Sequence, residues 1–450
     1  MPNTTVIGLY VNYSGQKTFK KEGEFMDVWD YQKPSFGFIS TRFAGLDGVS
    51  LETNKWAEVL RAKGCPVYFM AGKLDTDPLI SHLVPEAYFE HEDIVKIQKT
   101  LFVEKKRTRE ISNRIQQIKE LIKDEIRKFH SKFGFKFLVV QNASAIPVNI
   151  PLGLAIAEYI IENDMPTIAH HHDFFWERDR FNSKVVSDYL RAAFPPVHPN
   201  IQHVVINSIA GYDLGRYTGA SWTLIPNILD FKTFPPGIDE YNKAFKNEIG
   251  LEENTLLILQ PTRIVSRKGI ETALELVRKL DLPKASLVIT HEAGDEGIKY
   301  LNRIKEYANF IEVDLKIISD RVGLKRKTDK NGKKIFTLWD AYINADLVSY
   351  PSLYEGFGNA FVEAVYFKKP LVINRYAIFI ADIEPKGFNV VSYDGFITDQ
   401  TKRKIHNLLD NPKKVADMAE TNYMIGWRYL SYEMLEEKLE QLLVNHYGAM

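Results

Sequence analysis

Residues 347–370, LVSYPSLYEGFGNAFVEAVYFKKP, place an apolar run, a glycine turn and an apolar helical pattern one after another. The run Leu347–Tyr350 predicts a buried strand. Gly356 and Gly358 let the backbone turn sharply before a helix that we expect from about Asn359 to Phe367. A strand that passes through a tight turn into a helix is typical of parallel α/β sheets.

The same alternation of short apolar runs and longer amphipathic stretches continues along the chain in two series. The expected strands are Ser35–Thr41, Pro66–Gly72, Phe135–Gln141, Thr167–His171 and Val204–Asn207, then Leu256–Arg263, Ser286–His291, Leu315–Ser319, Leu347–Pro351 and Leu371–Asn374. Helical patterns such as Leu51–Lys63 and Gly153–Glu162 lie between them. Each series spans roughly 200 residues, which predicts two doubly wound domains with a ligand cleft between them. Three prolines in 225–249 mark the link.

The composition limits the classes of function. The chain has 450 residues, 45% of them hydrophobic, and a formal net charge of zero, so nothing favours nucleic acid as a partner. The single cysteine, Cys65, cannot form an internal disulfide and indicates a reducing compartment. The first residues lack a basic leader, and no apolar stretch is long enough to span a membrane. We therefore expect a cytoplasmic protein, with residues 1–34 as an extension packed on the first domain.

Residues 104–132 predict a long charged helix with ten Lys or Arg against five Asp or Glu and an isoleucine-rich stripe. A membrane-surface helix is one interpretation. The stripe lacks interfacial tryptophan, so we favour a helix buried on one side against the sheet.

Glu355 and Glu363 flank the glycine turn and the start of the helix after it. Helix amides and the helix dipole favour phosphate at such a start, whereas carboxylates accept hydrogen bonds from sugar hydroxyls. Glu363 lies one turn into the helix, and its side chain can point back toward the same ligand. The pair therefore fits a ligand with both groups, although two surface carboxylates would show the same spacing.

Basic residues follow another expected strand. Arg263 and Lys268 stand at the end of the strand that begins at Leu256 and just before a helix expected over Gly269–Leu280. A guanidinium fork and an ammonium group together suit a diphosphate. Arg267, next to Lys268, is expected to be a solvated charge.

Three consecutive histidines lie at the end of the expected strand Thr167–His171 and at the start of the loop that follows it. Alternation along a strand places His170 and His172 on one face and His171 on the other. The spacing does not match a zinc motif, so we predict no metal. A histidine here can instead bind a sugar hydroxyl, with Asp173 fixing its tautomer, and Trp176 can offer a ring face, although a core tryptophan is commoner.

The segment 42–50, RFAGLDGVS, follows the first strand and contains Gly45 and Gly48 in a tight loop. It is not a dinucleotide fingerprint. Asp47 either contributes to a ligand site or caps the helix that begins near Ser50. The four segments all lie where strands of a parallel sheet end, and this joint placement predicts a site.

Together these residues resemble the retaining glycosyltransferases of family 4, which have the GT-B fold. Glu355 to Glu363 looks like the E-x7-E motif of that family, Arg263 to Gly269 its Arg and Lys segment, and Gly45 to Ser50 its glycine loop. Asn207-Ser208 and Pro226-Asn227 with Asp230 resemble the segment before the linker. The resemblance covers about residues 35–430; Thr262, where the family often has glycine, and the extension 1–34 depart from it.

The resemblance implies site residues. Catalytic roles fall on His172, Glu355, Arg263 and Lys268, with the choice among His170, His171 and His172 left open. The donor would contact Arg263, Lys268, Glu355, Gly356, Phe357, Gly358, Asn359 and Glu363, with Glu363 on ribose hydroxyls. The acceptor would contact Gly45, Asp47, Gly48, Val49, His172, Asp173 and Trp176. The implied domains are an acceptor domain over 1–230, a donor domain over 231–426 and a helix over 427–450 that packs back on the first domain.

The resemblance also implies an activity: transfer of a hexose from a nucleoside diphosphate sugar, of GDP-mannose or UDP-glucose type, to a small soluble acceptor with retention of configuration. Neither metal nor cofactor is expected. The His-Asp-Phe loop resembles members that make mannosylglucosylglycerate, sucrose or trehalose-type solutes. A sugar phosphorylase, a peripheral lipid glycosyltransferase and a non-catalytic nucleotide-sugar binding protein remain alternatives, and a homo-oligomer stays open.

Overall fold

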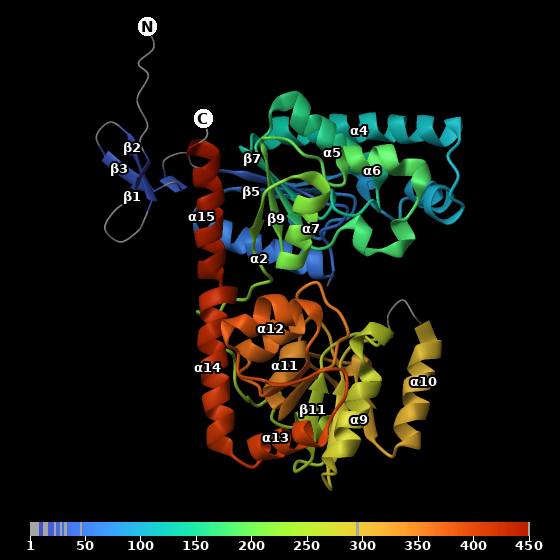
Figure 1. Cartoon of the computed structure of the whole chain (residues 1–450), viewed down its shortest axis with the longest axis vertical. Coiled ribbons are helices and arrows are strands. Elements are labelled where there is room, and N and C mark those ends of the chain that lie inside the picture. The colour runs from blue at the N-terminus through green and yellow to red at the C-terminus, as the bar shows by residue number, and fades with distance from the viewer. Residues whose placement is uncertain are drawn as a thin grey trace. The chain divides into compact units, whose positions relative to one another are not determined.

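Parallel strands alternate with helices through both parts of the chain (Figure 1). The computed structural model describes residues 9–11, 17–21, 24–27, 29–30, 34–45, 47–293 and 297–448. The chain divides into unit 1, residues 1–226 and 432–450, and unit 2, residues 227–431. The functional division into acceptor and donor domains stays a prediction.

Each unit has a parallel sheet. Among the described residues, unit 1 contains a seven-stranded sheet in the order β10-β9-β8-β7-β4-β5-β6, and unit 2 a six-stranded sheet in the order β13-β12-β11-β16-β17-β18. The strands of unit 1 are β4 (Phe36–Ile39), β5 (Val67–Ala71), β6 (Ser81–Leu83), β7 (Phe137–Gln141), β8 (Thr167–His171), β9 (Ile201–Val205) and β10 (Trp222–Leu224). Those of unit 2 are β11 (Leu256–Gln260), β12 (Ala285–Ile289), β13 (Asp314–Ile317), β16 (Leu347–Tyr350), β17 (Leu371–Asn374) and β18 (Val391–Tyr393). Two small antiparallel sheets among the described residues comprise β1 (Leu9–Val11), β2 (Lys17–Lys21) and β3 (Glu24–Asp27), and β14 (Lys327–Thr328) and β15 (Lys334–Ile335).

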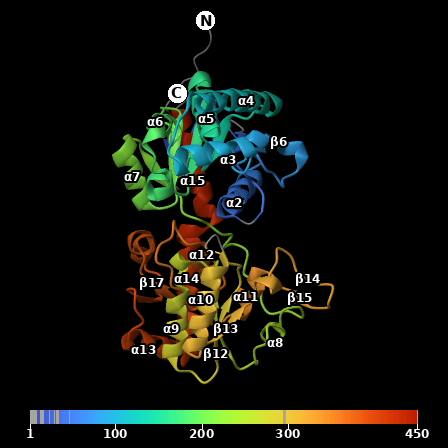
Figure 2. The ribbon, with the colours of Figure 1, turned by 90° about the vertical axis from the view of Figure 1, so that its right-hand side faces the viewer.

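Helices lie between the parallel strands, and the last three helices follow the final strand (Figure 2). Those of unit 1 are α2 (Gly48–Ala62), α3 (Glu92–Gln98), α4 (Arg109–Phe133), α5 (Ile150–Asn163), α6 (Ser187–Ala193), α7 (Ser208–Thr218) and α15 (Tyr432–Gly448). Those of unit 2 are α8 (Phe245–Glu248), α9 (Ile270–Leu280), α10 (Gly297–Phe310), α11 (Leu338–Asn344), α12 (Asn359–Tyr366), α13 (Asp399–Leu409) and α14 (Pro412–Leu430). The predicted class, α/β with doubly wound sheets, is confirmed.

The strand orders place the candidate loops. In unit 2 the order reverses between β11 and β16, and in unit 1 it reverses between β4 and β7. Ligands of such sheets bind beyond the carboxyl ends of the strands at this switch point. The loops that leave β11 and β16 carry the predicted donor residues, and the loops that leave β4 and β8 carry the predicted acceptor residues.

The long charged helix of unit 1 is α4, and it packs along α5 (Figure 1). Its isoleucines and Phe129 are buried in the core cluster of unit 1, as the preferred interpretation of 104–132 required. On the polar side, Lys123 bonds to Glu158 at 2.7 Å and to Glu162 at 2.9 Å, which joins α4 to α5. These pairs give the buried ammonium group of Lys123 partners within unit 1.

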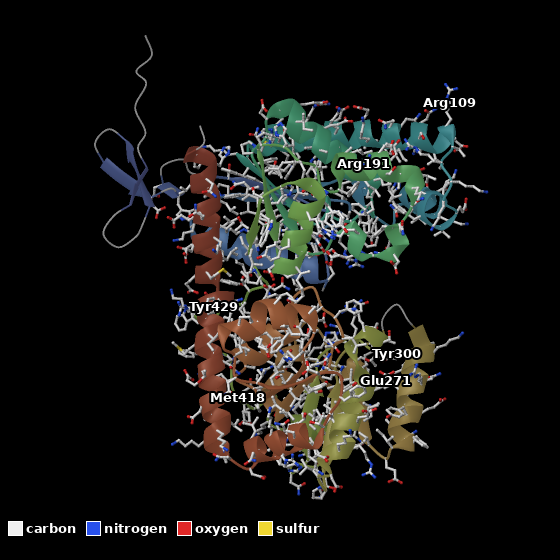
Figure 3. All side chains as sticks on the ribbon, in the orientation of Figure 1. Arg109, Arg191, Glu271, Tyr300, Met418 and Tyr429 are labelled. Carbon is white, nitrogen blue, oxygen red and sulfur yellow. The ribbon has the colours of Figure 1, made fainter. Side chains whose placement is uncertain are left out.

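In unit 2, α9 and α10 lie side by side on the sheet, and a hydrogen bond connects them. The hydroxyl of Tyr300 in α10 donates to the carboxylate of Glu271 in α9 at 2.7 Å (Figure 3). The buried faces of both helices belong to the core cluster of this unit. This packing fixes the start of α9, where one of the candidate loops ends.

The C-terminal helical stretch expected over Trp427–Tyr447 is divided at Ser431, whose extended backbone separates α14 from α15. Helix α15 packs on α2 and belongs to unit 1, whereas α14 belongs to unit 2. The expected extension 1–34 lies largely outside the described residues. No helix within the described ranges is long and apolar enough to cross a membrane.

Candidate functional site

Two loops of unit 2 meet at the switch point of its sheet. Residues Ser266–Lys268 form a short 3-10 turn after β11, and Gly269 follows with a φ of 63°. The loop from β16 crosses directly beside it: a Cβ built on Gly269 would lie 2.3 Å from the carbonyl oxygen of Pro351. The amide of Leu353 donates to the carbonyl of Arg267 at 2.8 Å. Only glycine fits this crossing, which brings the basic loop against the glutamate loop.

Glu355 is held by two cations at this crossing. Its carboxylate accepts hydrogen bonds from the ammonium group of Lys268 and, at 3.1 Å, from the guanidinium of Arg267. The side chains of Glu355 and Lys268 are 8% and 11% exposed, so both charges are buried. The expectation that Arg267 is a solvated charge is therefore wrong, because the 3-10 turn directs it at Glu355.

The cations decide the protonation state of Glu355. Burial alone would raise the pKa of this carboxyl, but Lys268 and Arg267 hold the pKa below its usual value. Glu355 is therefore ionised at neutral pH. Such a carboxylate can accept hydrogen bonds from a polyol and, by pairing with Lys268, also keeps that ammonium group in place.

The glycine turn after Glu355 is closed by two buried tyrosine hydroxyls. Gly358 has a φ of 126°, and a Cβ there would lie 2.8 Å from the hydroxyl of Tyr376 and 2.9 Å from that of Tyr350. Tyr376 also donates to the carbonyl of Phe357 at 2.6 Å. Helix α12 then begins at Asn359, as predicted. The turn is thus fixed, with the start of α12 behind it.

Glu363 lies one turn into α12. Its Oε2 accepts a hydrogen bond from the hydroxyl of Tyr342 in α11 at 2.8 Å. The Oδ1 of Asn359, at the helix start, accepts one from the amide of Asn227 at 2.5 Å. Both polar groups predicted to contact a nucleotide sugar are therefore oriented by partners within unit 2.

Arg263 and His291 complete this group of side chains. Arg263 is exposed in the loop that follows β11. Burial and the charges of Lys268 and Arg263 lower the pKa of His291 to about 4, so the imidazole is neutral. Sequence reasoning missed His291, although it closes the expected strand Ser286–His291 at the same sheet edge. The predicted donor residues are thus brought together by the structure, while their roles stay predictions.

In unit 1 the glycine loop ends in a helix cap. Asp47 is the N-cap of α2; it accepts hydrogen bonds from the amides of Val49 and Ser50 at 3.2 Å and pairs with Arg42 at 3.0 Å. Gly45 has a φ of 79°, and Gly48 is the first helical residue. The capping interpretation of Asp47 is confirmed, and a role of this loop toward an acceptor stays a prediction.

The three histidines alternate as predicted. The rings of His170 and His172 lie 4.5 Å apart, whereas His171 points to the other face and bonds to His203 at 3.0 Å. The Oε1 atom of Gln141 lies 3.0 Å from Nδ1 of His170 and 3.4 Å from Nε2 of His172. The three side chains therefore do not meet at one point, because His171 lies on the other face, and the described residues contain no group of three or more ligands that could hold a metal ion.

His172 is neutral, and its ring bonds to Gln141 rather than to Asp173. Burial lowers the pKa of His172 to about 4, although Asp173 and Asp47 oppose this. Asp173 instead accepts a hydrogen bond from Asn142 at 2.9 Å and pairs with Arg178. The expectation that Asp173 fixes the histidine tautomer is thus wrong.

Trp176 lies within an aromatic cluster. Its ring stacks on Phe174 with centroids 4.4 Å apart and an interplanar angle of 12°, and Tyr217 packs on it at 4.8 Å. One ring face is therefore occupied by the protein. A sugar contact at Trp176 stays a prediction.

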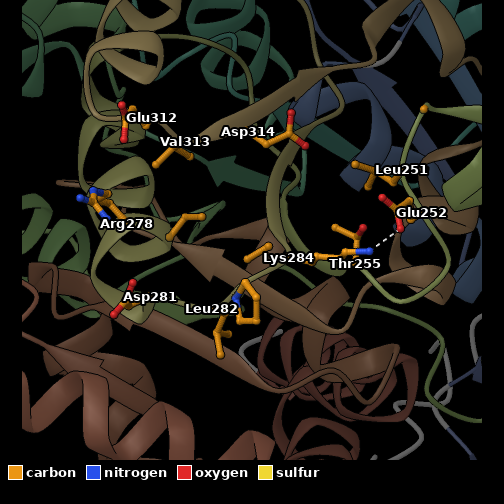
Figure 4. Close-up of a pocket in the computed structure, with 14 residues that line it drawn as sticks. Leu251, Glu252, Thr255, Arg278, Asp281, Leu282, Lys284, Glu312, Val313 and Asp314 are labelled. Atoms are coloured by element: carbon orange, nitrogen blue, oxygen red, sulfur yellow. Dashed lines mark hydrogen bonds and ion pairs between the residues drawn. The ribbon is translucent and has the colours of Figure 1, made fainter.

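A cavity of about 370 Å³ lies elsewhere in unit 2 (Figure 4). It is lined by residues at the amino ends of the strands, among them Glu252, Lys284 and Asp314, and Lys284 pairs with Glu252 at 2.5 Å. None of the predicted site residues contributes to it. We do not regard it as the functional site, because ligands of doubly wound sheets bind at the carboxyl ends.

Comparisons with known proteins identify the family. The model of "Glycosyl transferases group 1" matches residues 242–424, the part of the chain that carries the paired glutamates and their cations. A mannosylglucosylglycerate synthase from Petrotoga mobilis is 33% identical over 381 residues, which are 79% of this chain and 86% of that protein. The chain belongs to the group 1 glycosyltransferases. This glycosyltransferase is also 29% identical over 436 residues to a mannosylglucosylglycerate synthase from Thermotoga maritima, covering 88% of this chain and 96% of the relative.

Solved structures give the fold of the glycosyltransferase. The sucrose-phosphate synthase of Thermosynechococcus elongatus superposes with a TM-score of 0.64 over 93% of this chain and 100% of its own, at 14% sequence identity. At this identity the likeness shows the fold alone, which is GT-B, as predicted.

Proposed function

We propose that the chain transfers a mannosyl group from a nucleoside diphosphate sugar to glucosylglycerate, and so forms mannosylglucosylglycerate. The observation that carries the proposal is the 33% identity to a mannosylglucosylglycerate synthase over 79% of the chain. The cluster of buried and exposed charges in unit 2 supports it, because this cluster suits a ligand with a diphosphate and several hydroxyls.

The donor side of the proposal uses unit 2. Arg263 and Lys268 bind the diphosphate as a guanidinium fork and a point charge. Glu355 accepts hydrogen bonds from the transferred sugar, and Glu363 accepts them from the ribose. When the diphosphate binds, it competes with Glu355 for Lys268. The carboxylate is then released toward the sugar while Arg267 keeps it in reach.

The reaction proceeds with retention and without a metal in this proposal. The bond between C1 of the sugar and the phosphate oxygen breaks, and the diphosphate leaves with the electron pair. The acceptor hydroxyl attacks C1 from the same face, and its proton passes to the leaving phosphate oxygen. Arg263 and Lys268 stabilise the charge that develops on the diphosphate, so catalysis consists of positioning and electrostatics.

The acceptor side uses unit 1. His172, neutral at physiological pH, contacts a sugar hydroxyl, and the loop Gly45–Val49 with Asp173 and Trp176 borders the acceptor. The single cysteine of the sequence supports work in a reducing compartment, which we take to be the cytoplasm.

A transfer assay tests the proposal. The purified chain is incubated with GDP-mannose, UDP-mannose or UDP-glucose and glucosylglycerate, in EDTA, and the product is identified by mass and by NMR of the new anomeric centre. We expect a mannosylated product with the configuration of the donor, and loss of turnover in Lys268→Ala. Inversion would refute the retaining mechanism, and dependence on added metal would refute the metal-free one. Activity only with inorganic phosphate and a disaccharide would identify a phosphorylase instead.

A further inference from the structure

Tyr342 forms a buried hydrogen bond to one of the two motif glutamates. It lies in α11, outside the E-x7-E stretch, and its side chain is completely buried. Its hydroxyl lies 2.8 Å from Oε2 of Glu363 and 3.3 Å from the carbonyl oxygen of Ala360. Its ring stacks on Phe367 with centroids 5.1 Å apart and an interplanar angle of 7°. The hydroxyl is thus fixed by packing rather than by solvent.

This hydroxyl can only act as a donor toward Glu363. Burial, together with the neighbouring carboxylate of Glu363, raises the pKa of Tyr342 well above its ordinary value. The phenol therefore keeps its proton throughout the physiological range. A buried donor at 2.8 Å from a carboxylate makes a charge-assisted hydrogen bond, which is about twice as strong as a neutral one.

We propose that Tyr342 is a positioning residue for the nucleotide: its hydroxyl fixes the Glu363 carboxylate in the orientation that accepts the ribose hydroxyls of the donor. The inference rests on the proposed function, in which Glu363 binds ribose. It adds a residue from a different helix that acts on the nucleotide through Glu363.

The expected loss of ribonucleotide affinity follows from conformational entropy. A glutamate that must be ordered on binding costs about 0.5–1.5 kcal/mol, and a side chain already ordered by Tyr342 avoids this cost. At 1.4 kcal/mol for each tenfold change, its loss weakens ribonucleotide binding by about 2- to 12-fold. A nucleotide without ribose hydroxyls cannot use Glu363, so its affinity should not change.

The experiment compares Tyr342→Phe with the native chain by titration calorimetry, with GDP and UDP and their 2′,3′-dideoxy counterparts as probes. Phenylalanine keeps the ring and its stacking on Phe367. The matched control is Tyr423→Phe, which removes another buried hydroxyl of unit 2, one that donates to the carbonyl of Phe231 at 2.6 Å. We expect Tyr342→Phe to lose affinity for the ribonucleotide only, and Tyr423→Phe to keep the native ratio.

A double mutant separates positioning from general damage. Ribose selectivity is the ratio of the affinities for a ribonucleotide and its dideoxy counterpart. If Tyr342 acts through Glu363, then Tyr342→Phe should not lower this ratio further in a Glu363→Gln background. Equal losses for ribo- and dideoxynucleotides, or unchanged selectivity in Tyr342→Phe, overturn the inference. If selectivity disappears in Glu363→Gln but survives in Tyr342→Phe, only the inference fails. If the native chain binds no nucleotide, the proposed function fails with it.

Discussion

Replacement of Gly269 by alanine tests whether the contact between the two loops of unit 2 creates the donor site. Gly269 has a φ of 63°, and its Cβ position lies 2.3 Å from the carbonyl oxygen of Pro351. Ordinary contacts of a Cβ begin at 3.4 Å, so the loops must separate by about 1 Å. Lys268 precedes Gly269 directly, and this movement pulls its ammonium group away from Glu355.

The expected effect of Gly269→Ala on stability and on rate has two parts. A left-handed backbone costs an alanine about 1–2 kcal/mol, and this part lowers the free energy of unfolding only. The displacement adds a second loss of stability, and a misplacement of about 1 Å at a catalytic group can cost about 100-fold in rate. We therefore expect Gly269→Ala to lose more than 2 kcal/mol of stability and about 100-fold in kcat/KM.

The control is Gly250→Ala, because Gly250 in the same unit has a φ of 78° but no atom within 4 Å of its Cβ position. Gly250→Ala should lose only the stability that a left-handed backbone costs an alanine, and it should keep its kcat/KM. Denaturant unfolding and steady-state kinetics of both variants give the comparison. If Gly269→Ala matches Gly250→Ala in stability and in kcat/KM, the close crossing of the loops does not build the site.

Three further perturbations follow from individual contacts. Arg267→Gln removes a cation that lowers the pKa of Glu355, so this pKa should rise and the fall in kcat/KM on acidification should begin at a higher pH. An acidic limb of the pH profile that does not shift would contradict the pairing of Arg267 with Glu355. Asp47→Ala should cost about 1 kcal/mol in denaturant unfolding and Asp47→Asn less, since asparagine still caps; equal losses would argue against the cap. The Oε1 atom of Gln141 can only accept a hydrogen bond, so the Nε2 atom of His172 beside it should carry the proton. We expect ¹⁵N NMR to show the Nε2–H tautomer of His172 in the native chain and a mixture of tautomers in Gln141→Leu. An Nδ1–H tautomer in the native chain would refute the hydrogen bond to Gln141.

The strands were predictable because buried parallel strands are continuous apolar runs. Thr167–His171 and Leu371–Asn374 coincide with β8 and β17. The apolar run Val204–Asn207 predicts a strand that begins later than β9, which is Ile201–Val205. The side chain of Asn207 instead accepts a hydrogen bond from the amide of Ala210 and begins α7. A cap residue that also looks like the end of a strand shifts the boundary.

Pairing of the charges could not be predicted in the same way. Lys268 and Glu355 lie 87 residues apart, and neither motif alone shows that they touch. Arg267 looked solvated because its position on a 3-10 turn, and hence its direction toward Glu355, has no periodic signature. His291 is similar: its place at a strand end was visible, but its proximity to Lys268 depends on the order of strands in the sheet.

The division between α14 and α15 was also invisible, because Ser431 is neither proline nor glycine. The start of α14 has a clear sequence signal, because Asn411 caps the helix and Pro412 is its first residue. The expected helix from Trp427 does not take this signal into account. Local chemistry marks helix starts more strongly than a break made by tertiary contacts.

In the proposed function, unit 2 binds a nucleoside diphosphate sugar through Lys268 and Glu363. The most direct measurement is a thermal-shift titration with GDP, UDP and ADP and with their mannose and glucose conjugates, on the native chain, Lys268→Ala and Glu363→Ala. A ligand at 100 times its Kd stabilises the folded state by about 2.7 kcal/mol. We expect a rise in Tm with one nucleotide family that is lost in both variants. No rise with any of these ligands, or an equal rise in the variants, would show that these two residues do not bind the donor.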